Sequence, residues 1–173
     1  MNYLDRQGVL VDNGFVRFNT ALRSEFKLSN RITIGENLNV TYTNNTGGNG
    51  EAFENANRMT PLLPTHDDEG NYAGTYAPAL GLGNTRNPLA QLERAADNYT
   101  QSLRVFGNAY LDINILDGLN FRSNIGMNTQ VLNQRSFTKL DPEHSEPLST
   151  NSLFMQYNDS YEMVFTNTLN YNK

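Results

Sequence analysis

The sequence contains no cysteine and no tryptophan among its 173 residues, and only 6 prolines. The lack of cysteine excludes thiol catalysis, disulfide bonds and thiolate metal sites. No apolar run approaches the ~20 residues that a membrane-spanning helix needs. Residues 1–6 lack the basic and apolar regions of a signal peptide. The net charge of −5 offers no basic footprint for nucleic acid, so this partner class is not expected.

The chain is instead rich in amide, hydroxyl and aromatic side chains. It has 26 Asn, 15 Thr, 9 Tyr and 9 Phe, whereas hydrophobic residues make up 38% and charged residues 18%. This composition is not that of a disordered chain, because aromatic and β-branched residues are plentiful. Thr, Tyr and Phe favour strands, and Asn is a poor helix former. The composition therefore predicts an all-β protein with a polar surplus.

Apolar and polar residues alternate strictly through several long segments. The apolar side chains fall on even positions before residue 44 and on odd positions after residue 99. A period of two indicates strands with one apolar face and one wet face. We predict an antiparallel meander whose even and odd apolar residues share one face, part of a transmembrane β-barrel with long outer loops. The predicted strands are residues 3–11, 15–28, 32–43, 100–115, 119–132 and 160–171.

Short turns predict how the strands pair. A three-residue loop at 29–31 places apolar residues opposite one another on a single face, as a meander requires. At 116–118 we expect a second three-residue loop, with Gly118 left-handed and Ile115 opposite Leu119. A two-residue loop there would bring opposite faces together.

Long connections alternate with these short turns. They occupy residues 44–99 and 133–159 and contain glycine-rich, proline-rich and acidic stretches. Within them only residues 88–96 have helical spacing, with Pro88 in the first turn. Outer-membrane barrels show the same asymmetry of short inner turns and long outer loops.

Strand length and aromatic placement also favour a barrel. The clearly alternating strands have 12–16 residues, and twelve residues tilted about 40° span about 30 Å, enough for the apolar band of an outer membrane. The aliphatic middle of the apolar face is flanked by two aromatic girdles, formed by Phe18, Tyr42 and Tyr161 at the outer edge and Phe26, Phe121 and Tyr171 at the inner edge. The alternative is a soluble or surface β-sandwich, perhaps carbohydrate-binding, whose apolar face would pack on a second sheet.

Glu36 interrupts the apolar column. It lies two positions beyond Ile34, toward the inner edge, where a carboxylate costs little. Gly35 beside it would permit a local bulge.

Eight segments occur in a specific order: 14–19 (GFVRFN), 28–38 (LSNRITIGENL), 60–61 (TP), 68–72 (DEGNY), 87–90 (NPLA), 104–111 (RVFGNAYL), 116–126 (LDGLNFRSNIG) and 168–171 (TLNY). In this order and spacing the chain resembles the barrel region of SusC/RagA-type TonB-dependent outer-membrane transporters. The resemblance covers nearly the whole chain.

The resemblance implies an importer of glycans or peptides in the outer membrane of a Gram-negative cell. Its implied partners are TonB, a SusD-like surface lipoprotein, the oligosaccharide or peptide substrate, and outer-membrane lipid. Barrels of this class have about 22 strands and a plugged lumen, whereas this sequence shows no plug domain, TonB box or signal peptide. We therefore expect a barrel fragment.

No convergent set of acid, base and nucleophile occurs, so an enzyme is not expected, and neither a cofactor nor a metal site is predicted. His66 and His144 are expected to be solvated loop residues, and the acidic turn at 67–70 lacks the spaced oxygen ligands of a calcium loop. Polar residues of the wet face would line a lumen. The lumen-facing candidates are Arg17, Arg23, Arg104, Asn108, Asp112, Arg122 and Asn128.

Overall fold

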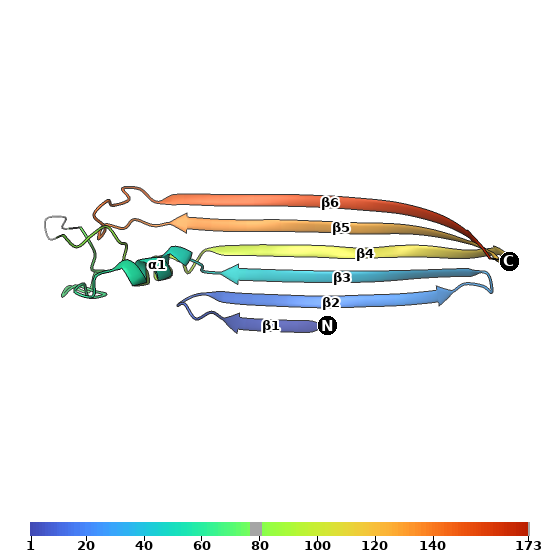
Figure 1. The fold of residues 1–173 in the computed structure, drawn as a ribbon, viewed down its shortest axis with the longest axis horizontal. Helices are drawn as coiled ribbons and strands as arrows, with labels where there is room; N and C mark the ends of the chain where they lie inside the picture. Colours follow the sequence, from blue (N-terminus) through green and yellow to red (C-terminus); the bar gives the residue numbers. More distant parts are fainter. Residues whose placement is uncertain (77–80, 173) are drawn as a thin grey trace.

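The computed structural model describes residues 1–76 and 81–172, and shows one six-stranded antiparallel sheet (Figure 1). The strands follow one another across the sheet in chain order, so the predicted all-β meander is confirmed. Their bounds are Asn2–Gln7 (β1), Gly14–Lys27 (β2), Ile32–Thr46 (β3), Tyr99–Leu116 (β4), Leu119–Thr138 (β5) and Ser152–Tyr171 (β6).

The strand register confirms the predicted faces. One row of paired residues crosses five strands, from Leu22 through Leu38, Gly107 and Met127 to Met163. Cross-strand partners share a face, and so does every second residue of a strand. The even residues of β2 and β3 and the odd residues of β4, β5 and β6 therefore form the apolar face, and the intervening residues form the wet face.

The ends of four strands differ by three or more residues from the predicted ranges, and β3 is one of them, since it continues to Thr46. β1 ends at Gln7, because the Gly8 amide donates to the Asn13 carbonyl and closes a turn. β5 continues to Thr138, and β6 begins at Ser152, well before residue 160. In this part of β6, large apolar residues such as Phe154 occupy even positions, which belong to the wet face. The alternation is therefore lost there, although β5 and β6 remain paired through their backbones.

The turn between β4 and β5 corrects the prediction of a three-residue loop. Leu116 pairs with Leu119, so Asp117 and Gly118 alone form the loop. The register shifts between Asn114 and Leu116, and this bulge brings the apolar columns back into alignment. Gly118 adopts the expected left-handed conformation, with φ of 83°.

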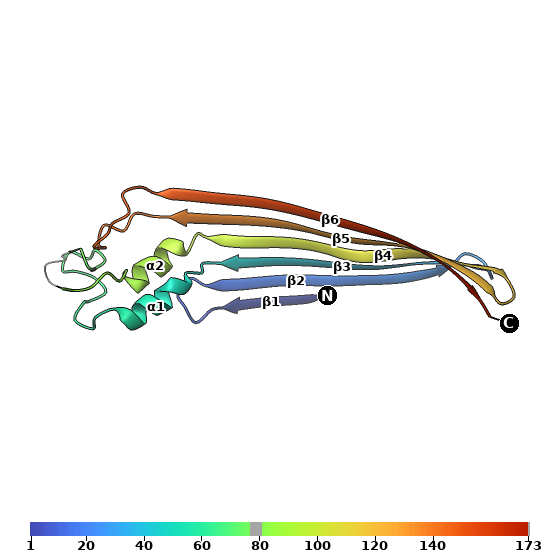
Figure 2. The ribbon, with the colours of Figure 1, turned by 45° about the horizontal axis from the view of Figure 1, so that its top comes forward.

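The connections lie as the alternation predicts. The turns after β2 and β4 lie at one end of the sheet, and the long loops after β3 and β5 lie together at the other (Figure 1). The sheet also curves along its length toward the turn end (Figure 2).

The two long loops pack together into a loop unit, comprising residues 47–76, 81–98 and 139–151. It holds helices α1 (Gly50–Arg58) and α2 (Pro88–Ala95); α2 matches the predicted helix, whereas α1 was not expected. Arg94 forms an ion pair with Glu143 at 2.5 Å, and Arg86 forms one with Asp141 at 2.7 Å. These pairs join the loop after β3 to the loop after β5.

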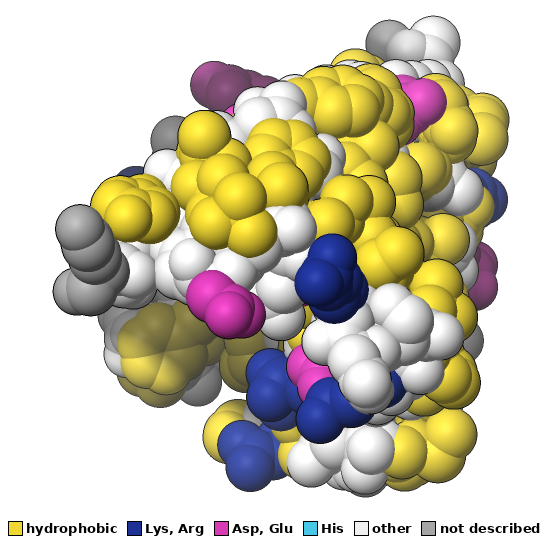
Figure 3. All heavy atoms as spheres, turned by 90° about the vertical axis from the view of Figure 1, so that its right-hand side faces the viewer, with side chains coloured by type: hydrophobic (Ala, Val, Ile, Leu, Met, Phe, Trp, Pro, Cys, Tyr) yellow, Lys and Arg dark blue, Asp and Glu magenta, His cyan; other side chains and the backbone are white. Residues whose placement is uncertain are grey.

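Hydrophobic side chains stay exposed along the sheet. Viewed along the strands from the turn end, they gather in broad patches (Figure 3). Leu22, Phe26, Phe165 and Leu169 are each more than half exposed. Within residues 1–76 and 81–172 a single sheet is formed, so no second sheet covers this face as a sandwich requires. None of the helices in the described part of the chain is long and apolar enough to cross a membrane.

We expect the 173 residues expressed alone to be insoluble in water. The outer edges of β1 and β6 are unpaired, and the apolar face has no protein partner in the described residues. Sedimentation after expression without detergent measures this. A soluble monomer with a cooperative thermal transition would support the sandwich instead.

Candidate functional site

A ladder of polar side chains crosses the wet face from β2 to β5. Arg23 Nε donates to Asn37 Oδ1 at 2.5 Å, and Asn37 Nδ2 donates to Asn108 Oδ1 at 3.3 Å. Asn108 Nδ2 in turn donates to Asn124 Oδ1 at 2.6 Å. Each amide is oriented by its neighbour, so the ladder presents its remaining donors and acceptors in a defined arrangement.

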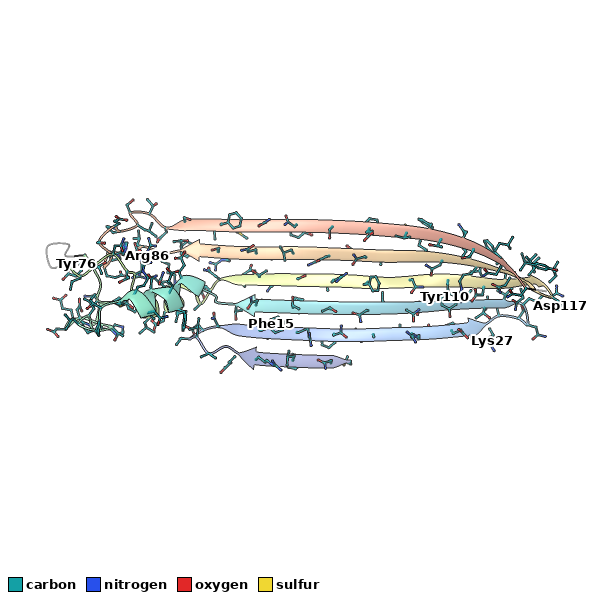
Figure 4. The ribbon with its side chains drawn as sticks, in the orientation of Figure 1. Phe15, Lys27, Tyr76, Arg86, Tyr110 and Asp117 are labelled. Carbon is teal, nitrogen blue, oxygen red and sulfur yellow. The ribbon has the colours of Figure 1, made fainter. Side chains whose placement is uncertain are left out.

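Tyr110 lies beside this ladder, toward the turn end of β4 (Figure 4). Its hydroxyl donates to Glu25 Oε2 on β2 at 2.8 Å, so the side chain reaches across β3. The residue of β3 between them is Gly35, where a Cβ atom would lie 2.3 Å from the tyrosine ring. The expected bulge at Gly35 does not form, because its pairing with both neighbouring strands is regular. The absence of a side chain at Gly35 instead allows the Tyr110 ring to lie close to the backbone of β3.

Arg122 completes the cluster from β5. Its guanidinium donates to both carboxylate oxygens of Asp112, at 2.7 and 2.6 Å, and its Cζ lies 4.8 Å from the centre of the Tyr110 ring. This bidentate geometry holds both side chains in place. Asp112 neutralises Arg122 locally, whereas Arg23 and Glu25 have an amide and a phenol as their partners.

A cavity of about 560 Å³ opens on this part of the wet face. Its walls combine amides, hydroxyls, one phenol and charged groups that have partners. Such a surface suits a ligand with many hydrogen-bonding groups. The lining residues are Arg23, Glu25, Asn37, Asn108, Tyr110, Arg122, Asn124, Thr166 and Thr168.

The structure brings part of the predicted set together. Arg23, Asn108 and Arg122 line the cavity, and Asp112 anchors Arg122. Arg104 and Asn128 form a separate pair, at 3.0 Å. Arg17 lies on the same face near the loop end, opposite Thr43 of β3.

The sequence prediction missed several members of this cluster. Asn37 and Asn124 are amides of the wet face, and Tyr110 is an aromatic residue of the same face. Their positions in the alternation would have identified them as wet-face residues. Their contacts depend on the strand pairing, which places Tyr110 opposite Gly35.

The two histidines occupy different environments. His144 is 5% exposed rather than solvated as expected, and its ring nitrogens lie 2.8 Å from the carbonyl oxygens of Glu146 and Asn84. It therefore helps to join the two long loops. His66 lies in an exposed turn beside Tyr72, with ring centres 5.1 Å apart. Across residues 1–76 and 81–172, no group of three metal-binding side chains forms.

Asp67 organises the acidic turn instead of offering a free carboxylate. Backbone amides of Asn71 and Glu69 donate to Oδ1, at 2.8 and 3.0 Å. The hydrogen bond from the Asn71 amide is the main cause of a pKa below the ordinary value for this carboxyl.

This lowered pKa predicts an acid-sensitive turn. Protection of the Asn71 amide from hydrogen exchange should be complete above the ordinary pKa of an aspartate, about 3.9, and fall as the pH drops through the lower folded value. Asp67→Ala should remove both the protection and its pH dependence. Protection that is unchanged by this substitution would contradict the assignment.

Long two-faced strands with a wet, amide-lined face are consistent with a segment of a β-barrel wall. No known family profile matches the chain. It is 29% identical over 178 residues to TonB-dependent receptor P39 of Formosa agariphila, an alignment that covers 99% of this chain and 16% of that receptor. This similarity supports a relationship between the chain and TonB-dependent receptors. The chain spans about a sixth of the length of the receptor that it matches.

Proposed function

We propose that this chain forms part of the barrel wall and outer loops of a SusC/RagA-type TonB-dependent importer in a Gram-negative outer membrane. The observation that carries the proposal is the two-faced sheet, whose strands have 14–20 residues from β2 to β6. Strands of this length exceed the usual 5–6 residues of globular proteins and suit a tilted crossing of a bilayer. Similarity to a TonB-dependent receptor adds independent support.

Aromatic side chains on the apolar face support the same orientation. Phe18 lies directly opposite Tyr42 at the loop end of the belt, and Phe26 lies one step from the turn on the same column. Phe121 and Leu169 pair on β5 and β6 at the turn end. Aromatic residues flanking an aliphatic band are expected where a barrel meets the two bilayer interfaces.

In this proposal the wet-face cavity belongs to the lumen, and the loop unit faces the exterior. Oligosaccharides or peptides are the proposed cargo, because both carry many neutral donors and acceptors that amide and hydroxyl walls can match. TonB and a SusD-like surface lipoprotein are the proposed partners.

Uptake by a strain that carries the complete reading frame tests this proposal. Deletion should abolish growth on a glycan or peptide source too large for passive diffusion, while growth on monosaccharides and amino acids continues. Loss of TonB should give the same defect.

The variant Arg122→Gln, which breaks the bidentate contact with Asp112, should insert normally and alter the concentration dependence of uptake. Normal growth of the deletion strain on every glycan and peptide source would refute the importer.

A further inference from the structure

Glu36 is a charged residue on an otherwise uncharged stretch of the apolar face. On that face, residues 16–26, 32–42, 103–113, 121–131 and 161–171 contain no other Asp, Glu, Lys or Arg. Ser24 lies opposite Glu36 on β2, and its hydroxyl donates to Glu36 Oε1 at 2.9 Å. A hydroxyl leaves the negative charge unbalanced, so the site is complementary to a cation.

A groove of about 410 Å³ surrounds this carboxylate. Its small residues are Ser24, Ala109 and Ser123, which lie between larger side chains of the same face. The larger apolar walls are Phe26, Ile34, Leu111 and Ile125. The groove therefore combines one anionic group, two hydroxyls and an apolar lining.

The position of the groove matches one kind of ligand. Phe26 and Ile34 pair directly and lie one step nearer the turn end than Ser24 and Glu36. In the proposed barrel this aromatic level meets the headgroup region of the inner leaflet. A headgroup that enters at Phe26 would meet the carboxylate of Glu36, and its acyl chains would continue past Leu22 and Leu38, which lie one step nearer the midplane.

We propose that this groove binds a phospholipid with a primary ammonium headgroup, namely phosphatidylethanolamine. This inference rests on the proposed function, because it requires the apolar face to contact lipid. The ammonium group donates charge-assisted hydrogen bonds to Glu36, and the Ser123 hydroxyl in the groove is the donor offered to the phosphate, because Ser24 already donates to Glu36. A trimethylated choline headgroup has no N–H to donate, and an anionic glycerol headgroup is repelled by the carboxylate.

Native mass spectrometry of the protein from its complete reading frame tests the site. Detergent-purified protein is mixed with phosphatidylethanolamine, phosphatidylcholine and phosphatidylglycerol of identical acyl chains, and retained lipid is counted. The wild type should retain phosphatidylethanolamine preferentially, and Glu36→Gln should reduce this preference on the order of tenfold, as loss of a charge-assisted hydrogen bond implies. The matched control is Glu162→Gln, which makes the same change on the wet face of β6, where Glu162 accepts from Asn128.

Three results would overturn the inference: equal retention by wild type and Glu36→Gln, an equal effect of Glu162→Gln, or retention of phosphatidylcholine equal to that of phosphatidylethanolamine. Heat-modifiable gel mobility of the same samples separates this failure from failure of the proposed function. Folded barrels without lipid preference contradict the lipid site alone. A wild type that shows no barrel mobility shift contradicts both.

Discussion

Met127→Arg is expected to abolish most outer-membrane insertion of the protein from its complete reading frame. Met127 lies in the middle of the apolar face, opposite Gly107 on one side and Met163 on the other. An arginine at the lipid midplane of a barrel costs roughly 2–4 kcal/mol. This is a large share of a net stability of about 5–15 kcal/mol. Heat-modifiable gel mobility of the membrane fraction measures the folded portion.

The neighbouring residue supplies the matched control. Asn128 is on the wet face, where it accepts from Arg104 Nε and donates to Glu162. Asn128→Arg introduces the same side chain one residue away, yet its guanidinium ends in water near a carboxylate and should leave insertion nearly unchanged. Equal loss of insertion in both variants would show that the face assignment is wrong. Greater loss for Asn128→Arg would mean that the wet face is the packed one.

Gly35→Ala is expected to destabilise the folded barrel by about 1–3 kcal/mol, the usual cost of overpacking. The added Cβ would lie 2.3–2.6 Å from three atoms of Tyr110, namely Cζ, Oη and Cε1. The ring can yield only by leaving Glu25, to which it donates, and Arg122, which lies against it. The midpoint of urea unfolding in lipid vesicles measures the change.

A double-mutant cycle shows whether the tyrosine ring is the cause. In a Tyr110→Ala background the space above Gly35 is open, so Gly35→Ala should cost much less there than in the wild type. Gly35→Ala with the same cost in both backgrounds would contradict the proposed contact.

The alternation predicted the faces of the sheet because an apolar environment and water impose opposite demands on successive residues of a strand. Any hairpin consistent with the apolar columns satisfies that pattern, so it could not separate a three-residue loop from a two-residue loop with a bulge at Ile115. The columns align in both cases, and only the backbone pairing of Leu116 with Leu119 distinguishes them.

The loop unit could not be derived in the same way. Arg86 and Asp141 are 55 positions apart, and Arg94 and Glu143 are 49 apart, with no periodic pattern linking them. Helix α1 was missed because Ala52 is its one buried hydrophobic residue, so no apolar stripe marks it in the sequence. Its start depends on the Asn49 side chain, which accepts from the Glu51 amide.

The candidate cavity could be predicted from the sequence only in part. Arg23, Asn108 and Arg122 were predictable as wet-face residues, since the alternation assigns every second position to that face. Their grouping required the pairing of four strands and the absence of a side chain at Gly35.

Cysteine scanning along β4 tests the central claim most directly, because the chain has no native cysteine. Single cysteines at each position from 103 to 113, placed in the protein from its complete reading frame with any other cysteine removed, are labelled in native membranes with a water-soluble maleimide. A sheet with one lipid face and one wet face predicts a period of two, with labelling at Arg104, Asn108 and Asp112 and protection at Leu103, Val105 and Leu111. Uniform labelling, or protection in the opposite phase, would contradict the assignment of the two faces.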